Sequence, residues 1–399
     1  MGTNADVIGF RIVNANTASA FENRVPDGDG AGGYNEYTDY ITYESTVSPP
    51  DPPENTTIDL AGITQFDVSW TEPSTGGRID NYRVQRSVDG GSYSTVATPG
   101  SSTTSYTDTD ITTDTDYRYR VRSENSLENS DWSYTTTRTS GGAPKTPAIG
   151  TPTETSLPLS WTNPAGDLDT VEIHVSTSSG TTLSDYSLLT TDTTGDYTHT
   201  GLVNGRTYHY RLVAVYPDGD SSPTSEISET TLLPNPTLDA VTAGYREVVV
   251  DWTLNDNNPD GDVTVYRDGG SVTTITELAT TSYTDDGLLD GEEYSYYIER
   301  ATPDASGSTG SLSDVTDLPA PTDLTVDAIT ATSTDLSWAD NHNYGDTEVQ
   351  YKQSDAASWT TFSTLALNTE AETISDLLNG EQYDARVVAV TEHSSTVDQ

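Results

Sequence analysis

A short apolar strand that ends in tryptophan occurs four times in this chain, at intervals of about ninety residues. Apolar residues alternate with polar ones before each tryptophan, and this period of two predicts a β-strand with one buried face. The four copies are Phe66-Val68-Trp70, Leu157-Leu159-Trp161, Val248-Val250-Trp252 and Thr334-Leu336-Trp338. Because each copy of such a long repeat must bury a core of its own, we expect four similar small domains.

A second alternating strand in each copy begins at a tyrosine, roughly halfway to the next tryptophan. These tyrosines are Tyr117, Tyr208, Tyr294 and Tyr383, and an aliphatic residue stands six positions before each, namely Ile111, Leu202, Leu288 and Leu377. Three of the intervening turns contain a glycine, whereas the first contains Thr113 and Asp114. The spacing predicts a tyrosine corner, in which the phenol returns to the backbone and the ring joins the core.

A third strand lies between the other two, with Tyr82, Val171, Val263 and Val349 among its inward residues. The three strands, the corner and the repeat length together resemble the fibronectin type III family over roughly residues 50–399. The resemblance implies an all-β fold of four tandem sandwiches in an extended array, preceded by a short N-terminal β or extended anchor segment. It also implies that the tryptophans and the corner tyrosines belong to the structural core.

Proline-bearing segments precede each copy and mark semi-rigid joins. They divide the chain into a segment 1–48 and repeats at 49–141, 142–233, 234–318 and 319–399. The sequence after Tyr383 is too short for a complete last strand in the fourth repeat. Either a longer chain continues beyond Gln399 or a partner adds the missing strand, and a continuing chain is the favoured interpretation.

Residues 1–48 differ from the repeats. Val7–Val13 reads as a strand, and Tyr34, Tyr37, Tyr40 and Tyr43 form a tyrosine-dense stretch that favours an extended conformation. The segment is too short to bury a core alone, so we expect it to dock on another protein or to oligomerise, with a flexible leader as the alternative.

Acidic residues outnumber basic ones by 63 to 17, and the formal net charge is -46. Such a chain repels nucleic acid and anionic membranes at ordinary salt concentrations. Low hydrophobicity with high charge can also indicate disorder, but the regular repeats argue against it. In molar salt the Debye length falls to about 3 Å, so repulsion between surface charges is screened nearly to contact distance. The preference for Asp, the abundant Thr and the two lysines, Lys145 and Lys352, resemble proteins of extreme halophiles.

The chain contains no cysteine, so disulfides and thiolate metal sites are excluded. The first residues do not resemble a secretory signal, and no run approaches the ~20 apolar residues of a membrane span. We therefore expect synthesis in the cytoplasm without a signal peptide.

No catalytic site is predicted. The five histidines show no paired metal spacing, His174 and His209 are expected on the surface, and no P-loop, G-x-S-x-G or G-x-G-x-x-G occurs. Asp256, Asn258 and Asp260 alternate before a glycine as calcium ligands do, but Arg267 stands where the bidentate Glu belongs, so a plain turn is favoured. No cofactor is expected apart from this calcium candidate.

The leading hypothesis is a non-enzymatic structural protein of a virus of a halophilic archaeon. It resembles structural or adhesion proteins of such tailed viruses, and we expect it on the capsid or tail. Residues 1–48 would bind other virion proteins and form a homo-oligomer, and the repeats would meet a host glycoprotein or glycan. The alternative is a spacer or adhesion module of a haloarchaeal cell-surface or secreted carbohydrate-active protein; a cytoplasmic scaffold is a further possibility.

Overall fold

The computed structural model describes residues 23–26, 34–37, 48–126 and 128–398. Every regular element in these residues is a β-strand, apart from one turn of 3-10 helix at Leu183–Asp185. No helix in this part of the chain is long and apolar enough to cross a membrane. The chain forms two compact units: one contains repeat 1 with the segments Pro164–Leu168 and Tyr216–Ser221, and the other contains the remainder of repeat 2 with repeats 3 and 4.

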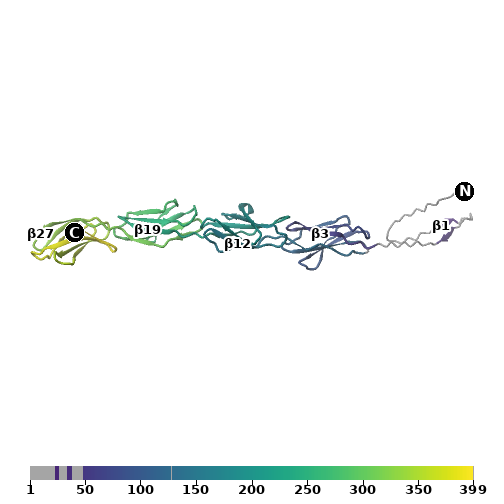
Figure 1. Ribbon diagram of the computed structural model, residues 1–399, viewed down its shortest axis with the longest axis horizontal. Helices are drawn as coiled ribbons and strands as arrows, with labels where there is room; N and C mark the ends of the chain where they lie inside the picture. Colours follow the sequence, from purple (N-terminus) through teal and green to yellow (C-terminus); the bar gives the residue numbers. More distant parts are fainter. Residues whose placement is uncertain (1–22, 27–33, 38–47, 127, 399) are drawn as a thin grey trace. The chain divides into compact units, whose positions relative to one another are not determined.

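Each repeat is a sandwich of two antiparallel sheets, as the alternating pattern predicted (Figure 1). In repeat 1 the smaller sheet has the order β3-β4-β7, and the larger has β10-β8-β5-β6 with β9 also on β8. The smaller sheet comprises β3 (Glu54–Gly62), β4 (Gln65–Thr71) and β7 (Ser105–Asp108). The larger comprises β5 (Asn81–Val88), β6 (Ser94–Ala97), β8 (Asp116–Glu124), β9 (Ser133–Tyr134) and β10 (Arg138–Thr139).

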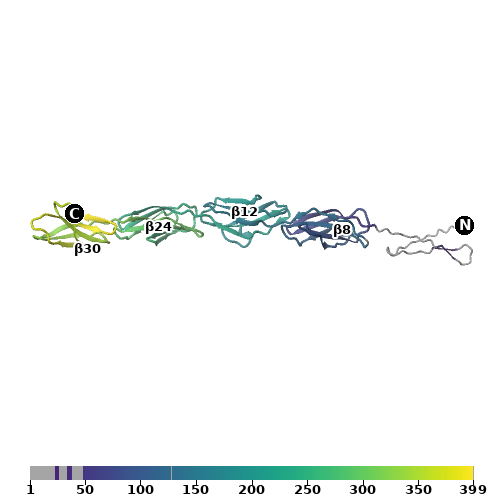
Figure 2. The ribbon, with the colours of Figure 1, turned by 90° about the horizontal axis from the view of Figure 1, so that it is seen from below.

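Repeat 2 has the same topology, with sheets β11-β12-β15 and β14-β13-β16-β17, and with β18 also on β16 (Figure 2). The smaller sheet comprises β11 (Lys145–Ile149), β12 (Ser156–Thr162) and β15 (Asp196–Thr200). The larger comprises β13 (Thr170–Ser176), β14 (Ser187–Asp192), β16 (Thr207–Tyr216), β17 (Gly219–Asp220) and β18 (Ile227–Thr230).

Repeat 3 repeats this plan with sheets β19-β20-β23 and β22-β21-β24-β25, and with β26 on β24. The smaller sheet comprises β19 (Thr237–Ala243), β20 (Glu247–Thr253) and β23 (Ser282–Asp286). The larger comprises β21 (Asp262–Arg267), β22 (Gly270–Ile275), β24 (Glu293–Ala301), β25 (Ser306–Ser308) and β26 (Leu312–Val315).

Repeat 4 has sheets β27-β28-β31 and β30-β29-β32-β33. Its strands are β27 (Thr322–Ile329), β28 (Thr334–Ala339), β29 (Asp346–Gln353), β30 (Thr360–Ala366), β31 (Ala371–Ile374), β32 (Tyr383–Val390) and β33 (Ser395–Asp398). β33 pairs with Val387–Val390 of β32. In repeats 2 and 3 a further strand pairs beside the corner tyrosine, and repeat 4 has no counterpart of it within residues 319–398.

The turn before the corner tyrosine needs one residue with positive φ, which disfavours most side chains. Gly205, Gly291 and Gly380 take this conformation in repeats 2 to 4, with φ between 56° and 84°. In repeat 1 it is Asp114, with φ of 54°. Asp tolerates this region better than most residues, which explains how the departing sequence keeps the same turn.

In the segment before repeat 1, β1 (Asn23–Pro26) pairs with β2 (Tyr34–Tyr37) in an antiparallel hairpin. Tyr34 and Tyr37 therefore lie on a strand. The predicted strand Val7–Val13 and the tyrosines Tyr40 and Tyr43 lie outside the described residues, as does most of the expected anchor.

Candidate functional site: corners, joints and arginine stacks

Each sandwich encloses one of the repeated tryptophans. Trp70, Trp161, Trp252 and Trp338 are between 2% and 6% exposed. Tyr117 and Tyr208 are buried as well, whereas Tyr294 and Tyr383 are half-buried. The phenol oxygens accept hydrogen bonds from the backbone N–H groups of Thr112, Val203, Leu289 and Leu378, at 2.8 to 3.1 Å. All four repeats thus have the same corner.

A hydroxyl group at the end of the last strand fixes this corner in repeats 1 to 3. In repeat 3 the Thr316 hydroxyl donates to the Leu289 carbonyl at 2.6 Å and accepts from the Glu292 N–H at 3.1 Å. Thr231 makes the same two bonds in repeat 2, and Ser140 makes them in repeat 1. We call this pair of bonds the hydroxyl clamp. It satisfies two backbone groups in a turn where the sheet cannot reach them.

The corner of repeat 2 bonds to a loop of repeat 3 within the same compact unit. The Asn204 N–H donates to the side-chain oxygen of Asn257, and the Asn257 N–H donates to that of Asn204, both at 2.8 Å. Nearby, the Thr302 hydroxyl donates to the Gly205 carbonyl at 2.8 Å. Arg206 forms an ion pair with Asp260 across the same joint.

The joint between repeats 3 and 4 is formed by residues at positions equivalent to those in the joint between repeats 2 and 3. The Asp290 N–H donates to Asn343 at 2.8 Å, and the Asn343 N–H donates back to the Asp290 carboxylate at 2.7 Å. Thr391 donates to the Gly291 carbonyl at 2.6 Å, as Thr302 does to Gly205. Arg246 pairs with Asp290, whose side chain is fully buried. Repeats 2, 3 and 4 are therefore connected by two joints that share the same arrangement of directional hydrogen bonds.

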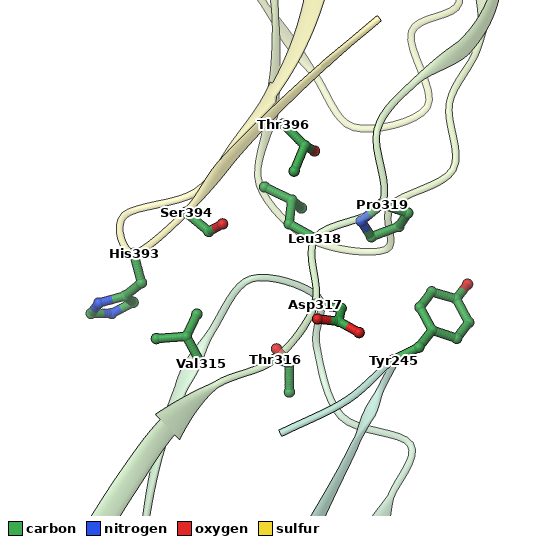
Figure 3. Close-up of a pocket in the computed structure, with 9 residues that line it drawn as sticks. All are labelled: Tyr245, Val315, Thr316, Asp317, Leu318, Pro319, His393, Ser394 and Thr396. Carbon is green, nitrogen blue, oxygen red and sulfur yellow. The ribbon is translucent and has the colours of Figure 1, made fainter. Parts of the chain in front are cut away.

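A hollow of about 530 Å³ lies beside this second joint (Figure 3). Its lining includes Tyr245, Asp317, Leu318, His393 and Thr396. Asp317 and His393 are its titratable groups besides Tyr245, and the hollow is open and mainly polar. It has the character of a gap between two loops rather than of an enclosed substrate pocket.

The calcium candidate at Asp256, Asn258 and Asp260 surrounds a guanidinium group. Arg300 is fully buried and donates to both Asp256 carboxylate oxygens, at 3.1 and 3.2 Å. It also donates to the backbone carbonyls of Asn258 and Asp260, each at 2.9 Å. A guanidinium group thus lies against the Asp256 carboxylate and two backbone carbonyls of this loop.

Two of the histidine placements differ from expectation. His174 is buried rather than on the surface, and its imidazole lies 2.9 Å from the Glu172 carboxylate. His209 is partly covered, and its ring bonds to Glu226 at 3.0 Å. Tyr186 also donates to Glu226, and this bond, together with those from Gly180, His209 and Ser179, lowers the pKa of Glu226 to about 2. Alternation along a strand identifies the outward face but not the neighbours that cover it.

Two buried carboxylates each face an arginine and a tyrosine at equivalent positions of repeats 1 and 3. In repeat 1, Asp108 accepts from Tyr119 at 2.7 Å and from Arg86 at 3.0 Å. In repeat 3, Asp285, Tyr296 and Arg267 form the equivalent arrangement. Burial raises the pKa of Tyr296, and so does its bond to Asp285. These groups satisfy one another within the core.

In each larger sheet, the residue three positions after the corner tyrosine stacks on an aromatic ring at the outer face of the sheet. This residue is an arginine in three repeats and a tyrosine in the other. The stacked pairs are Arg120 with Tyr93 and Trp132, Arg211 with Tyr186, Tyr297 with Tyr266, and Arg386 with Trp359. The ring-to-group distances run from 4.1 to 5.5 Å, within the range of cation–π and stacking contacts. These contacts attach a neighbouring strand or loop to the central strand.

Within the described residues no group of three or more His, Asp or Glu side chains could hold a metal ion. Sequence reasoning did not predict the hydroxyl clamp, the reciprocal hydrogen bonds at the two joints or the arginine stacks. A signal for the clamp exists, since Thr231 and Thr316 each stand three residues before a proline.

Comparison with known proteins agrees with this geometry. The fibronectin type III domain model matches residues 51–139, 142–231 and 319–398. Exoglucanase B of Cellulomonas fimi is 28% identical over 309 residues, which are 71% of this chain. The chain spans about a quarter of that relative's length, at 27%.

Two of the solved structures that match this chain also contain fibronectin type III domains by their names. A two-domain fibronectin type III segment of chicken tenascin is 21% identical and covers 45% of this chain and 100% of its own, with a TM-score of 0.26. The FN1–FN3 domains of chicken CNTN1 are 15% identical and cover 65% of this chain and 96% of theirs, with a TM-score of 0.23. Domains of this type are generally non-catalytic spacer or binding modules. With the family model matching more than half of its residues, this chain belongs to the fibronectin type III domain family.

Proposed function

We propose that this chain is a non-catalytic spacer and adhesion module of a secreted or cell-surface protein that works in concentrated salt. The observation that carries the proposal is the alignment with exoglucanase B, which spans 71% of this chain and 27% of that protein. The aligned length exceeds any one repeat, so the shared part is a multi-repeat module. A module of this kind would hold a carbohydrate-active domain or an adhesive surface away from its anchor.

The joints support a spacing role. Asn204 with Asn257, and Asp290 with Asn343, each form two short reciprocal bonds that fix direction as well as distance. A flexible tether would need no such bonds, because glycine- and serine-rich linkers suffice for it. Repeats 2 to 4 are therefore suited to transmit position along the chain.

The contacts of the aromatic residues on the outer sheet faces support a structural role for these side chains. Each stacked ring already contacts a guanidinium or another ring, as Trp359 does with Arg386 at 4.3 Å. Such rings contribute to the sandwich itself, so we assign any adhesion to the loops. A surface glycan or glycoprotein remains the proposed partner, and the acidic surface makes nucleic acid an unfavourable one.

Projection from the capsid or tail of a virus of a halophilic archaeon is the competing proposal. Both proposals use the same sandwiches, and they differ in where the protein is found. Quantitative mass spectrometry of cell envelopes, culture medium and purified particles from the source culture separates them. We expect recovery with envelopes or medium, and recovery confined to particles would overturn the proposal in favour of the virion.

A further inference from the structure

Four arginines share the outer face of the larger sheet in repeat 1. Arg118, Arg120 and Arg122 alternate with buried residues along β8, so they lie on the same side of the sheet. Arg83 on β5 pairs with Arg122 and extends the group onto the neighbouring strand. Successive arginines of β8 lie about 7 Å apart along the strand. We call these four residues the arginine face, and it gathers four of the chain's 17 basic residues on one surface.

Aromatic rings hold these side chains in place. Arg120 and Arg122 both stack on Trp132, at 4.1 and 4.6 Å from the ring centroid. Arg118 stacks on Tyr134 at 5.0 Å, and Tyr134 is itself 44% exposed. A guanidinium group that is already stacked loses little conformational entropy when it binds a ligand. The row of cations is therefore preorganised.

The arginine face carries more positive charge than its neighbours neutralise. Among the described residues its one ion-pair partner is Glu124, which contacts two of the four guanidinium groups, each at 2.6 Å. Arg118 donates instead to the Thr135 carbonyl at 3.1 Å. Arg120 donates to the Gln85 side-chain oxygen at 2.9 and 2.6 Å. Each guanidinium has five N–H donors, so both arginines have donors left for a ligand.

The other repeats show that the sandwich needs no more than one arginine at this face. Residues at the four equivalent positions are His209, Arg211, Val213 and Glu172 in repeat 2, Ser295, Tyr297, Glu299 and Thr264 in repeat 3, and Asp384, Arg386, Val388 and Glu348 in repeat 4. Each of these sets has at most one arginine and at least one carboxylate.

Repeat 4 makes the comparison most directly. Arg386 stacks on Trp359 at 4.3 Å and donates to the Gln350 side-chain oxygen at 2.8 Å. This arrangement reproduces Arg120 with Gln85 of repeat 1, without a further arginine at the equivalent positions. The three additional cations of repeat 1 are thus in excess of what the stack requires.

We propose that the arginine face of repeat 1 binds an acidic polysaccharide through the carboxylates of its uronic acid units. The planar guanidinium matches a carboxylate with two parallel hydrogen bonds. Such bonds act at contact distance, so they persist where a Debye length of about 3 Å removes long-range attraction. A linear polymer with carboxylates on successive sugar rings fits a straight row of cations beside the exposed ring of Tyr134.

Charge complementarity decides between this ligand and a nucleic acid. The whole chain carries a net charge of -46 and repels a dense row of phosphates. A polyuronate presents its charges singly and can meet the arginine face alone. The inference goes beyond the proposed function, because it adds a binding surface that is separate from the adhesive loops.

The experiment measures binding of the full chain to immobilised alginate, a linear polyuronate, by biolayer interferometry in multimolar, calcium-free KCl. Neutral dextran is the reference polymer. The decisive variant is Gln85→Glu, which keeps the oxygen acceptors of Arg120 but places a carboxylate beside it. We expect several-fold weaker binding to alginate. Gln350→Glu is the matched control, because it adds the same charge beside Arg386 in repeat 4 and should bind as the parent protein does.

A second variant leaves the Arg120 and Gln85 pair intact. Arg118→Gln removes an exposed cation and should also weaken binding, whereas Arg118→Lys keeps the charge and should retain part of it. Near-ultraviolet circular dichroism of each variant verifies that the sandwiches are intact.

Three results would overturn the proposal. One is alginate binding no stronger than dextran binding. Another is an equal effect of Gln85→Glu and Gln350→Glu, which would make net charge rather than the arginine face responsible. The third is tighter binding of double-stranded DNA than of alginate under the same conditions, since the face would then recognise phosphates.

Discussion

Asn204 and Asn257 each hold the backbone N–H of the other with a side-chain oxygen, at 2.8 Å in both directions. The two residues belong to consecutive sandwiches, and Asp290 and Asn343 repeat the arrangement one sandwich later. A loop that could have remained solvated is thereby attached to the preceding corner.

Replacing Asn257 by alanine should loosen the joint between repeats 2 and 3 without unfolding either. The change leaves the Asn204 N–H without its acceptor, which typically costs about 1–3 kcal/mol for a buried group. Hydrogen exchange followed by mass spectrometry should accelerate at residues 203–206 and 255–258. The exposed change Thr276→Ala is the control, and acceleration throughout the core of repeat 3 would contradict a joint-specific role.

Removing the buried guanidinium group of Arg300 should destabilise repeat 3 much more than the Asn257 substitution does. Arg300→Met leaves the buried Asp256 carboxylate without its ion-pair partner, and breaking such a pair costs about 3–5 kcal/mol. The double variant Arg300→Met with Asp256→Leu should recover much of this loss. Urea denaturation of the full chain measures it, and a single variant as stable as the parent protein would show that Arg300 does not organise the loop.

The same loop tests the calcium candidate. Because Arg300 already holds both Asp256 oxygens, 5 mM or so of calcium should leave the thermal unfolding temperature unchanged relative to magnesium, as ligands stabilise only the states that bind them. A calcium-specific rise of several degrees would mean that Asp256, Asn258 and Asp260 bind the ion despite the guanidinium.

The hydroxyl clamp should be sensitive to a methyl-for-hydroxyl exchange. Thr316→Val keeps the shape of the side chain but removes its bonds to Leu289 and Glu292, and we expect a loss of about 1–3 kcal/mol in repeat 3. Thr316→Ser keeps the hydroxyl and should cost less, as Ser140 already serves in repeat 1. Equal losses in the two variants would point to packing rather than hydrogen bonding.

Glu124 should make repeat 1 sensitive to acid. Burial alone would raise the pKa of Glu124, but hydrogen bonds from Arg83, Asn81 and Arg122 outweigh it and lower the pKa to about 2 from the ordinary 4.5. A folded-state pKa below the unfolded value stabilises the fold above about pH 4.5, and the contribution disappears as the pH falls toward about 2. Comparing the parent protein with Glu124→Gln across this range should show a stability difference that shrinks with acid. The exposed Glu128→Gln should show no such trend.

Salt should decide whether the sandwiches persist. With 63 acidic and 17 basic residues, charge repulsion is expected to oppose folding unless it is screened. Near-ultraviolet circular dichroism should show sharp tryptophan bands in multimolar KCl and lose them on dilution. Bands retained at ~0.1 M salt would contradict the proposed adaptation.

The sequence by itself determined the number of sandwiches, the inward apolar residues of the tryptophan and tyrosine strands, and the corner tyrosines. These features depend on period-two alternation and short spacings, which are local properties of the chain. Even the unusual turn at Asp114 was visible as a departure from the glycine of the other repeats.

Only the tertiary structure decided which polar groups meet. Asn204 and Asn257 are 53 residues apart, and Asp256 and Arg300 are 44 apart, so no local pattern relates them. Among so many acidic side chains, the few that are buried are distinguished by a facing arginine or N–H, and that neighbour depends on how the sheets and loops pack.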